Sequence, residues 1–190
     1  MWVLVLGLLL FFIPHSLKMI VPGPRAAFIA ARGEGPWKGL VALPSLVGIG
    51  LMIWGWMLYR DSAPELYAVP DWGVHVAAVT NLVGLMLLMM SGGPVGRIKA
   101  LIRHPMSIGI ALWGLGHLVS NGDLASLLLF GAWTLYSVVA AIVSTLRGDP
   151  APVFQSVRGD LTGILIGLGL YLAFVYFLHG WMFGIQPPVI

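Results

Sequence analysis

The sequence predicts an all-α fold, in the form of a polytopic membrane protein built as a bundle of six transmembrane helices. Composition is the first reason, because 59% of the 190 residues are apolar and only 9% are charged. A soluble domain carries about 25% charged residues, so a soluble globular protein is excluded. The second reason is the presence of six apolar segments. The third is the distribution of basic residues between these segments.

Each segment approaches the roughly 20 apolar residues that a helix needs to cross the hydrocarbon layer. The segments lie at residues 2–19, 40–59, 72–91, 105–120, 124–146 and 161–183. The first has no charge before Lys18 and lacks the basic start of a secretory signal, so we interpret it as a retained span. Asn121-Gly122-Asp123 is a turn signal that predicts an antiparallel hairpin of the fourth and fifth spans. Residues 21–36 are expected to form a loop, and residues 1–190 a single domain.

Basic residues fix the predicted orientation. Nine of the ten Lys and Arg residues fall in three alternate connections. They are Lys18, Arg25, Arg32 and Lys38, then Arg97, Lys99 and Arg103, then Arg147 and Arg158. Cytoplasmic loops are enriched in Lys and Arg. Six spans with both termini outside would put all nine of these basic residues on the cytoplasmic side. The cations form no patch that would indicate nucleic-acid binding, and membrane lipids are the expected partners.

Small residues within the spans predict close helix packing. Gly163 and Gly167 are four residues apart in the sixth span, and Gly48, Gly50 and Gly55 lie in the second. Glycines at such spacing let two helix backbones approach each other in a membrane. We therefore expect these positions to contact neighbouring helices; the alternative is that they leave room for a flat ligand.

Histidines are the residues that point to a site. An ionisable side chain within the hydrocarbon layer costs several kcal/mol, so each one is a functional hypothesis. His15 lies late in the first span, and His117 lies late in the fourth, with Trp113 and Asn121 on the same helix face. Two imidazoles on different helices, among aromatic residues and glycines, fit haem b held by axial histidines. The alternative is that these are buried histidines hydrogen-bonded between helices. The chain has no cysteine, which excludes disulfides, iron–sulfur clusters and thiolate ligands.

Several short motifs together resemble the NnrU family of bacterial membrane proteins, which are linked to denitrification loci. The N-terminal matches are Phe12-Ile13-Pro14-His15-Ser16, Pro24-Arg25, Arg32-Gly33-Glu34 and Ser45-Leu46-Val47-Gly48. The strongest run is Arg103-His104-Pro105, Gly109, Trp113, His117 and Asn121-Gly122-Asp123, followed by His179-Gly180 and Phe183-Gly184. The resemblance covers nearly the whole chain and implies a multi-pass protein of the bacterial inner membrane.

The same resemblance extends to the haem-containing zeta-carotene isomerase. It implies haem b as cofactor, His15 and His117 as iron ligands, and an apolar polyene as substrate. That isomerase has a cysteine where this chain has Gly114. In straight helices His15 and His117 would differ in depth by about 13 Å, so His75, which matches the depth of His117, is a second candidate partner. The basic residues Arg25, Arg32 and Arg103 are candidates to pair with haem propionates.

Three functions therefore compete. The first is a haem-binding protein with an isomerase-like or redox- or NO-related role, in which Trp113 and Asn121 orient His117. The second is a non-enzymatic membrane accessory protein of denitrification. The third is a lipid methyltransferase, because Arg103-His104-Pro105 is also similar to the isoprenylcysteine methyltransferase group. That group needs a glutamate in its last helices, where this chain offers only Asp149 and Asp160.

Overall fold

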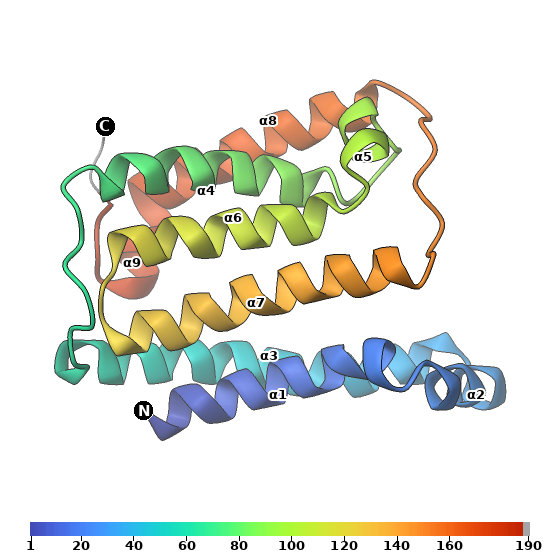
Figure 1. The fold of residues 1–190 in the computed structure, drawn as a ribbon, viewed down its shortest axis with the longest axis horizontal. Coiled ribbons are helices and arrows are strands. Elements are labelled where there is room, and N and C mark those ends of the chain that lie inside the picture. The colour runs from blue at the N-terminus through green and yellow to red at the C-terminus, as the bar shows by residue number, and fades with distance from the viewer. Residues whose placement is uncertain (188–190) are drawn as a thin grey trace. The chain divides into compact units, whose positions relative to one another are not determined.

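The structure is a computed structural model and describes residues 1–187. The chain divides into two compact units, Met1–Pro64 and Glu65–Ile190. The helices of the first unit are α1 (Trp2–Ile20), α2 (Pro22–Arg32) and α3 (Glu34–Tyr59), followed by a 3₁₀ turn, Arg60–Ser62 (Figure 1). The helices of the second are α4 (Gly73–Met89), α5 (Arg97–Ile102), α6 (Pro105–Ser120), α7 (Leu124–Leu146), α8 (Arg158–Ala173) and α9 (His179–Phe183). A five-residue π-helical turn, Phe174–Leu178, joins α8 to α9. The prediction of a single domain stays a prediction.

The all-helical architecture is confirmed within the described residues, and all six predicted segments are helical. Four helical stretches are long and apolar enough to cross a membrane. They are Trp2–Ile20, Glu34–Ser62, Leu124–Leu146 and Arg158–Phe183. Two further apolar helices are shorter, Gly73–Met89 and Pro105–Ser120. A membrane protein follows from the four long helices, whereas six spans and the side of each terminus stay predictions.

Unit 1 is held together by the packing of α1 on α3. Glycines at the contact let the two helix backbones approach each other closely. A Cβ atom at Gly7 would lie 2.6 Å from the amide nitrogen of Met52, and one at Gly48 would lie 2.9 Å from the carbonyl oxygen of Gly7. The expected packing role of Gly48 and Gly55 is confirmed. Gly50 faces open space instead, so that part of the expectation is wrong.

Unit 2 is organised around α4, which packs on both α6 and α8 (Figure 1). Gly84 and Gly109 meet where α4 crosses α6, and a Cβ on either would lie within 2.7 Å of the other's carbonyl oxygen. On the α8 side, Gly163 lies against Met90 and Gly167 against Met86, so the packing predicted for this pair is confirmed. The hairpin of α6 and α7 also forms, because the two helices pack on each other. The Asp123 carboxylate caps α7 by accepting a hydrogen bond from the Ser126 amide at 2.9 Å.

The loop expected over residues 21–36 is wrong, because most of it is helix. Helix α2 occupies Pro22–Arg32, and α3 begins at Glu34 rather than near residue 40. Prolines are tolerated in the first turn of a helix, where their missing N–H has no intrahelical partner, and α2 begins with two of them, Pro22 and Pro24. The four alanines that follow favour helix. Gly33, with φ of 84°, then ends the helix in a conformation that glycine adopts without strain.

Candidate functional site

His15 lies on α1 where that helix meets α3. Its Nδ1 atom is 2.8 Å from the carbonyl oxygen of Phe11, one turn earlier, and 3.4 Å from the Ser45 hydroxyl of α3. The Phe11 ring stacks on the imidazole, with ring centroids 4.2 Å apart and planes at 12°. Because a carbonyl oxygen only accepts hydrogen bonds, this contact puts the imidazole proton on Nδ1 and the lone pair on Nε2.

His15 lines a pocket of about 410 Å³ formed entirely by unit 1. Basic side chains gather at the end of the pocket where α1 stops and α2 and α3 start. These are Lys18 in the last turn of α1, Arg25 in α2 and Lys38 in the first turns of α3. Glu34 is the single carboxylate of the lining and pairs with Lys38 at 3.5 Å. The other end of the pocket is formed by Phe11, Val41 and Ala42 together with Ser45, so the pocket is cationic at one end and largely apolar at the other.

The three arginines considered for anion binding separate in the structure. Arg25 lines the His15 pocket, and its guanidinium lies 5.8 Å from the centre of the Trp37 ring. Arg32, two turns later on α2, lies over the Phe28 ring at 5.6 Å and is not part of the lining. Arg103 belongs to unit 2, where it donates a hydrogen bond to the backbone carbonyl of Asp149.

His117 lies on α6 in an aromatic cluster formed with α7. Its Nδ1 atom is 2.8 Å from the carbonyl oxygen of Trp113, one turn earlier. The imidazole stacks on Phe130 of α7 at a centroid distance of 4.3 Å and an angle of 22°. The Trp113 ring lies 4.9 Å from the imidazole and also contacts the edges of Phe130 and Trp133. Trp113 therefore orients His117 through its backbone carbonyl as well as its ring.

Asn121 contacts the backbone of His117 rather than its ring. The Asn121 side-chain amide donates to the His117 carbonyl at 2.8 Å and to the Ser120 hydroxyl at 3.1 Å. The Tyr67 hydroxyl donates to the carbonyls of Leu118 and, at 2.8 Å, Asn121. These bonds satisfy the last carbonyls of α6, which have no partner within the helix. The effect of Asn121 on the imidazole is thus exerted through the end of the helix.

His75 lies away from the face of α4 that packs on α6. That face carries Gly73, which abuts the carbonyl of Val119, and Ala77, which lies against Gly116. His75 falls between these two positions in sequence, about 200° around the helix from each. Its exposed side chain lines a separate groove of about 220 Å³ that includes Tyr171 of α8. The structure therefore does not bring His75 and His117 together.

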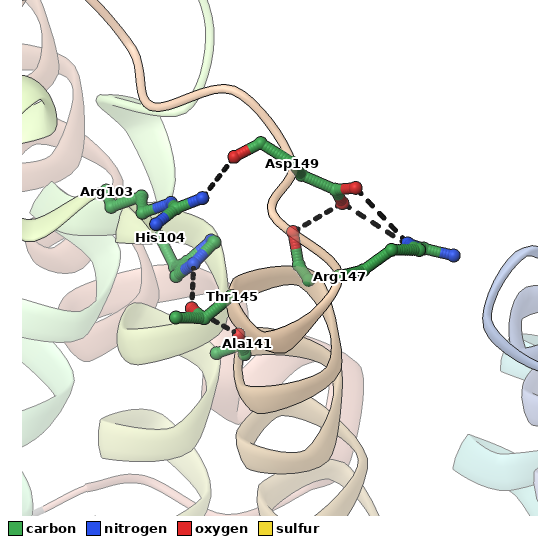
Figure 2. Close-up of polar contacts among 7 residues, drawn as sticks. Arg103, His104, Ala141, Thr145, Arg147 and Asp149 are labelled. Atoms are coloured by element: carbon green, nitrogen blue, oxygen red, sulfur yellow. Dashed lines mark hydrogen bonds and ion pairs between the residues drawn. The ribbon is translucent and has the colours of Figure 1, made fainter.

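Arg103 and His104 form a polar network with the end of α7 (Figure 2). Arg103 has a φ of 64°, and the His104 Nε2 atom lies 2.8 Å from the Thr145 hydroxyl. The Thr145 hydroxyl donates a hydrogen bond to the Ala141 carbonyl, so it accepts a hydrogen bond from the His104 Nε2–H group. Asp149 accepts hydrogen bonds from Ser144 at 2.6 Å and from Arg147 at 3.2 Å. These bonds hold the pKa of the Asp149 carboxyl below its usual value, the Ser144 bond being the larger cause. The network fixes the start of α6, which carries His117.

Sequence reasoning missed several residues that surround the two histidines. The sequence analysis interprets Lys18 and Lys38 only as orientation charges and Glu34 only as part of a family motif. Lys18 nevertheless follows His15 by three residues and so lies on the same face of α1. Phe130 carries no signal in the sequence, because its stacking on His117 is a contact between two helices. Within residues 1–187 no group of three or more His, Cys, Asp or Glu side chains gathers to hold a metal ion. A haem requires only one or two axial side chains from the protein.

A cysteine at the position of Gly114 would not fit this packing. A Cβ atom there would collide with the Thr134 hydroxyl and lie 2.9 Å from the carbonyl oxygen of Phe130. Helix α7 would have to move away to admit a larger side chain. The packing around His117 is therefore built for glycine.

The family described as NnrU protein has a model that matches residues 3–187, nearly the whole chain. No curated protein and no solved structure matches.

Proposed function

Because the chain belongs to the NnrU family, we propose that it is a multi-pass protein of the bacterial inner membrane that binds haem b through histidine. The proposal includes six membrane spans with both termini outside, in which α4 and α6 are the two short spans. It takes His15 and His117 as the ligand residues. The observation that carries it is the arrangement of His15, whose ring is held by a backbone carbonyl at the edge of a cationic and aromatic pocket.

The residues present fit haem b in three respects. First, both His15 and His117 form Nδ1 hydrogen bonds of 2.8 Å to a carbonyl, which leaves Nε2 as the basic nitrogen. Such a bond on the other ring nitrogen is the usual support of a metal-ligating histidine. Second, aromatic rings stack on both imidazoles. Third, the His15 pocket carries cations at one end, which suit a flat apolar ring with carboxylates on one edge.

When bound, haem b supplies an iron centre for one-electron chemistry or for binding a small ligand such as NO. The chain's own residues position the two imidazole rings. Phe11 and the Phe11 carbonyl fix the plane and the tautomer of His15, and Ser45 limits its rotation. Trp113 and Phe130 do the same for His117.

Gly114 favours a redox or NO-related role over an isomerase-like reaction on a polyene. With no cysteine in the sequence, no thiolate is available as an iron ligand. Imidazole ligation is typical of haem proteins that bind gases or transfer electrons. The denitrification context of the proposal comes from the family resemblance alone. An assay for isomerisation of an added carotene and an assay for NO binding distinguish the two reaction classes.

The test is the haem content of the purified protein. We expect close to one haem b per chain, measured as the pyridine haemochrome, in protein purified from membranes in mild detergent. His15→Ala and His117→Ala should each lower this ratio severalfold, whereas His75→Ala, in its separate groove, should leave it unchanged. A wild type that contains no haem and takes none up would overturn the proposal in favour of a non-enzymatic accessory protein.

A further inference from the structure

A groove of unit 2 contains two polar side chains that the haem proposal does not use. The groove has a volume of about 220 Å³, lies between α4 and α8, and is lined by His75, Ala78, Val79, Leu82 and Tyr171. The four residues from α4 follow one another at helical spacing, so they form a single stripe of that helix. Val79 is 63% exposed, and the groove therefore opens at the outer surface of the helices. With α4 and α8 placed as membrane spans, an occupant enters this groove from the lipid.

The packing of α4 on α8 sets the two polar side chains at opposite ends of the groove. Gly167 of α8 lies against Met86 of α4, and the two helices run antiparallel. One turn after this glycine, α8 carries the large side chain of Tyr171, which comes level with Leu82. His75 lies two turns before Leu82, about 10 Å away along the axis of α4. An apolar stretch of α4 thus separates the imidazole from the tyrosine.

Neither polar side chain is satisfied by the protein. Across residues 1–187, His75 and Tyr171 make no hydrogen bond and no ring contact. A hydrogen-bonding group without a partner is costly in a bilayer, where no water is present to supply one. Tyr171 can donate through its hydroxyl and His75 through a ring nitrogen. Among the described residues, the lining contains no Lys, Arg, Asp or Glu, so the groove suits an uncharged ligand with two hydrogen-bond acceptors.

We propose that the groove binds the headgroup of a membrane-soluble quinone, whose two carbonyl oxygens accept hydrogen bonds from His75 and Tyr171. The inference goes beyond the proposed function, because it uses the placement of α4 and α8 as spans but does not require haem. A quinone is uncharged and reaches the groove through the lipid. The phosphate of a phospholipid would find no cation in this lining, and a polyene hydrocarbon would leave both donors unpaired. The volume suits a single ring and is too small for a porphyrin.

Tyr176 provides a matched control on the same helical segment. It lies five residues after Tyr171, in the π-helical turn, and does not line the groove. Tyr176→Phe removes the same hydroxyl group as Tyr171→Phe does, so a difference between the two variants reports position. Val79→Trp provides a steric test that does not depend on hydrogen bonds. Because Val79 is exposed, a larger side chain there fills the groove without entering the protein core.

The experiment measures equilibrium binding of duroquinone, a tetramethylated benzoquinone, to the full-length protein in phosphatidylcholine nanodiscs, with partition into protein-free nanodiscs subtracted. Durene, which has the same ring without carbonyl oxygens, is the ligand control. Tyr171→Phe and His75→Phe should each weaken duroquinone binding by about threefold to tenfold, the usual effect of losing one hydrogen bond. Val79→Trp should abolish binding, and Tyr176→Phe should bind as the wild type does. Durene should bind weakly, and equally to the wild type, Tyr171→Phe and His75→Phe.

The other outcomes overturn the inference at different points. Duroquinone binding that is unchanged in both Tyr171→Phe and His75→Phe would show that these residues are not the donors. Durene bound as tightly as duroquinone would show that the groove does not recognise carbonyl oxygens. Val79→Trp that binds as the wild type does, or a wild type that binds no duroquinone, would overturn the site itself. The proposed function stands in each case, because the haem content of the same preparations is measured separately as the pyridine haemochrome.

Discussion

The Nδ1 atom of His117 lies 2.8 Å from the carbonyl oxygen of Trp113, one helical turn earlier on α6. His15 makes the same bond to Phe11 on α1, also at 2.8 Å. Each imidazole in addition stacks on a phenylalanine ring, at centroid distances of 4.3 Å and 4.2 Å. Two histidines from different helices thus share one local arrangement, in which the protonated nitrogen faces its own helix and the basic nitrogen points elsewhere.

This arrangement allows packing and ligation to be separated at His117. Phenylalanine in its place keeps a flat ring against Phe130 but has no nitrogen for a metal. We expect His117→Phe to unfold at nearly the wild-type temperature in detergent and to lose haem. His117→Ala should lose haem as well and, because it leaves a cavity, should lower the free energy of unfolding by about 1–3 kcal/mol. Haem retained at wild-type level by His117→Phe would contradict a ligand role for this residue.

The crossing of α4 and α6 should not tolerate a methyl group. A Cβ at Gly84 would lie 2.7 Å from the carbonyl oxygen of Gly109, an atom of the backbone that cannot rotate away. We expect Gly84→Ala to destabilise unit 2 by about 1–3 kcal/mol, the usual cost of overpacking. The control is Gly169→Ala on α8, where nothing lies within 4 Å of the added atom. Thermal unfolding of both variants in the same detergent compares them, and equal midpoints would refute the close crossing.

Asp160 should be the residue that orders α5. Its carboxylate accepts hydrogen bonds from the amides of Arg97 at 2.7 Å and Ile98 at 3.1 Å, the first two residues of that helix. Loss of such a cap costs about 1–2 kcal/mol, so Asp160→Ala should speed hydrogen exchange of amides in α5. Asp71→Ala, at an exposed position, removes the same charge without this contact. Unchanged exchange in Asp160→Ala would show that α5 is held by other contacts.

The Asp149 network predicts a loss of stability in acid. Hydrogen bonds from Ser144 and Arg147 hold the folded-state pKa of Asp149 below its ordinary value of about 4. The ionised carboxylate therefore favours the folded state above about pH 4, and this contribution disappears as the pH falls through the lowered pKa. Ser144→Ala should shrink the contribution of Asp149 to the pH dependence of stability, and Asp149→Asn should abolish that contribution. Unfolding midpoints between pH 3 and 6 measure the effect, and a Ser144→Ala profile identical to wild type would contradict it.

Much of the fold could be predicted because hydropathy and turn chemistry act locally. The apolar segments are helices, and the turn signal Asn121-Gly122-Asp123 lies between α6 and α7 as predicted. Helix α2 was missed because a short segment between prolines and glycines has the composition of a loop. Its helical state depends on alanine content and on contacts with α1 and α3. The first turns of α3, before residue 40, were not predicted for the same reason.

The candidate site was predictable only in part. His15, His117 and Trp113 stood out because ionisable and aromatic residues are conspicuous in an apolar helix. The pocket around His15 did not, because it forms only when α2 places Arg25 beside α1 and α3. The stacking of Phe130 on His117 is likewise a contact between helices that no spacing in the sequence reveals. Sequence patterns identify single residues here, while the partners of those residues come from packing.

The absorption spectrum of the full-length protein before and after reduction tests the central claim most directly. The purified protein is supplemented with haem b, freed of excess by gel filtration, and recorded oxidised and dithionite-reduced beside His15→Ala. The account predicts a Soret band with sharp α and β bands on reduction in the wild type, and loss of these bands in His15→Ala. A wild type that stays colourless after supplementation would contradict the account. So would a His15→Ala variant that keeps the same Soret, α and β bands as the wild type.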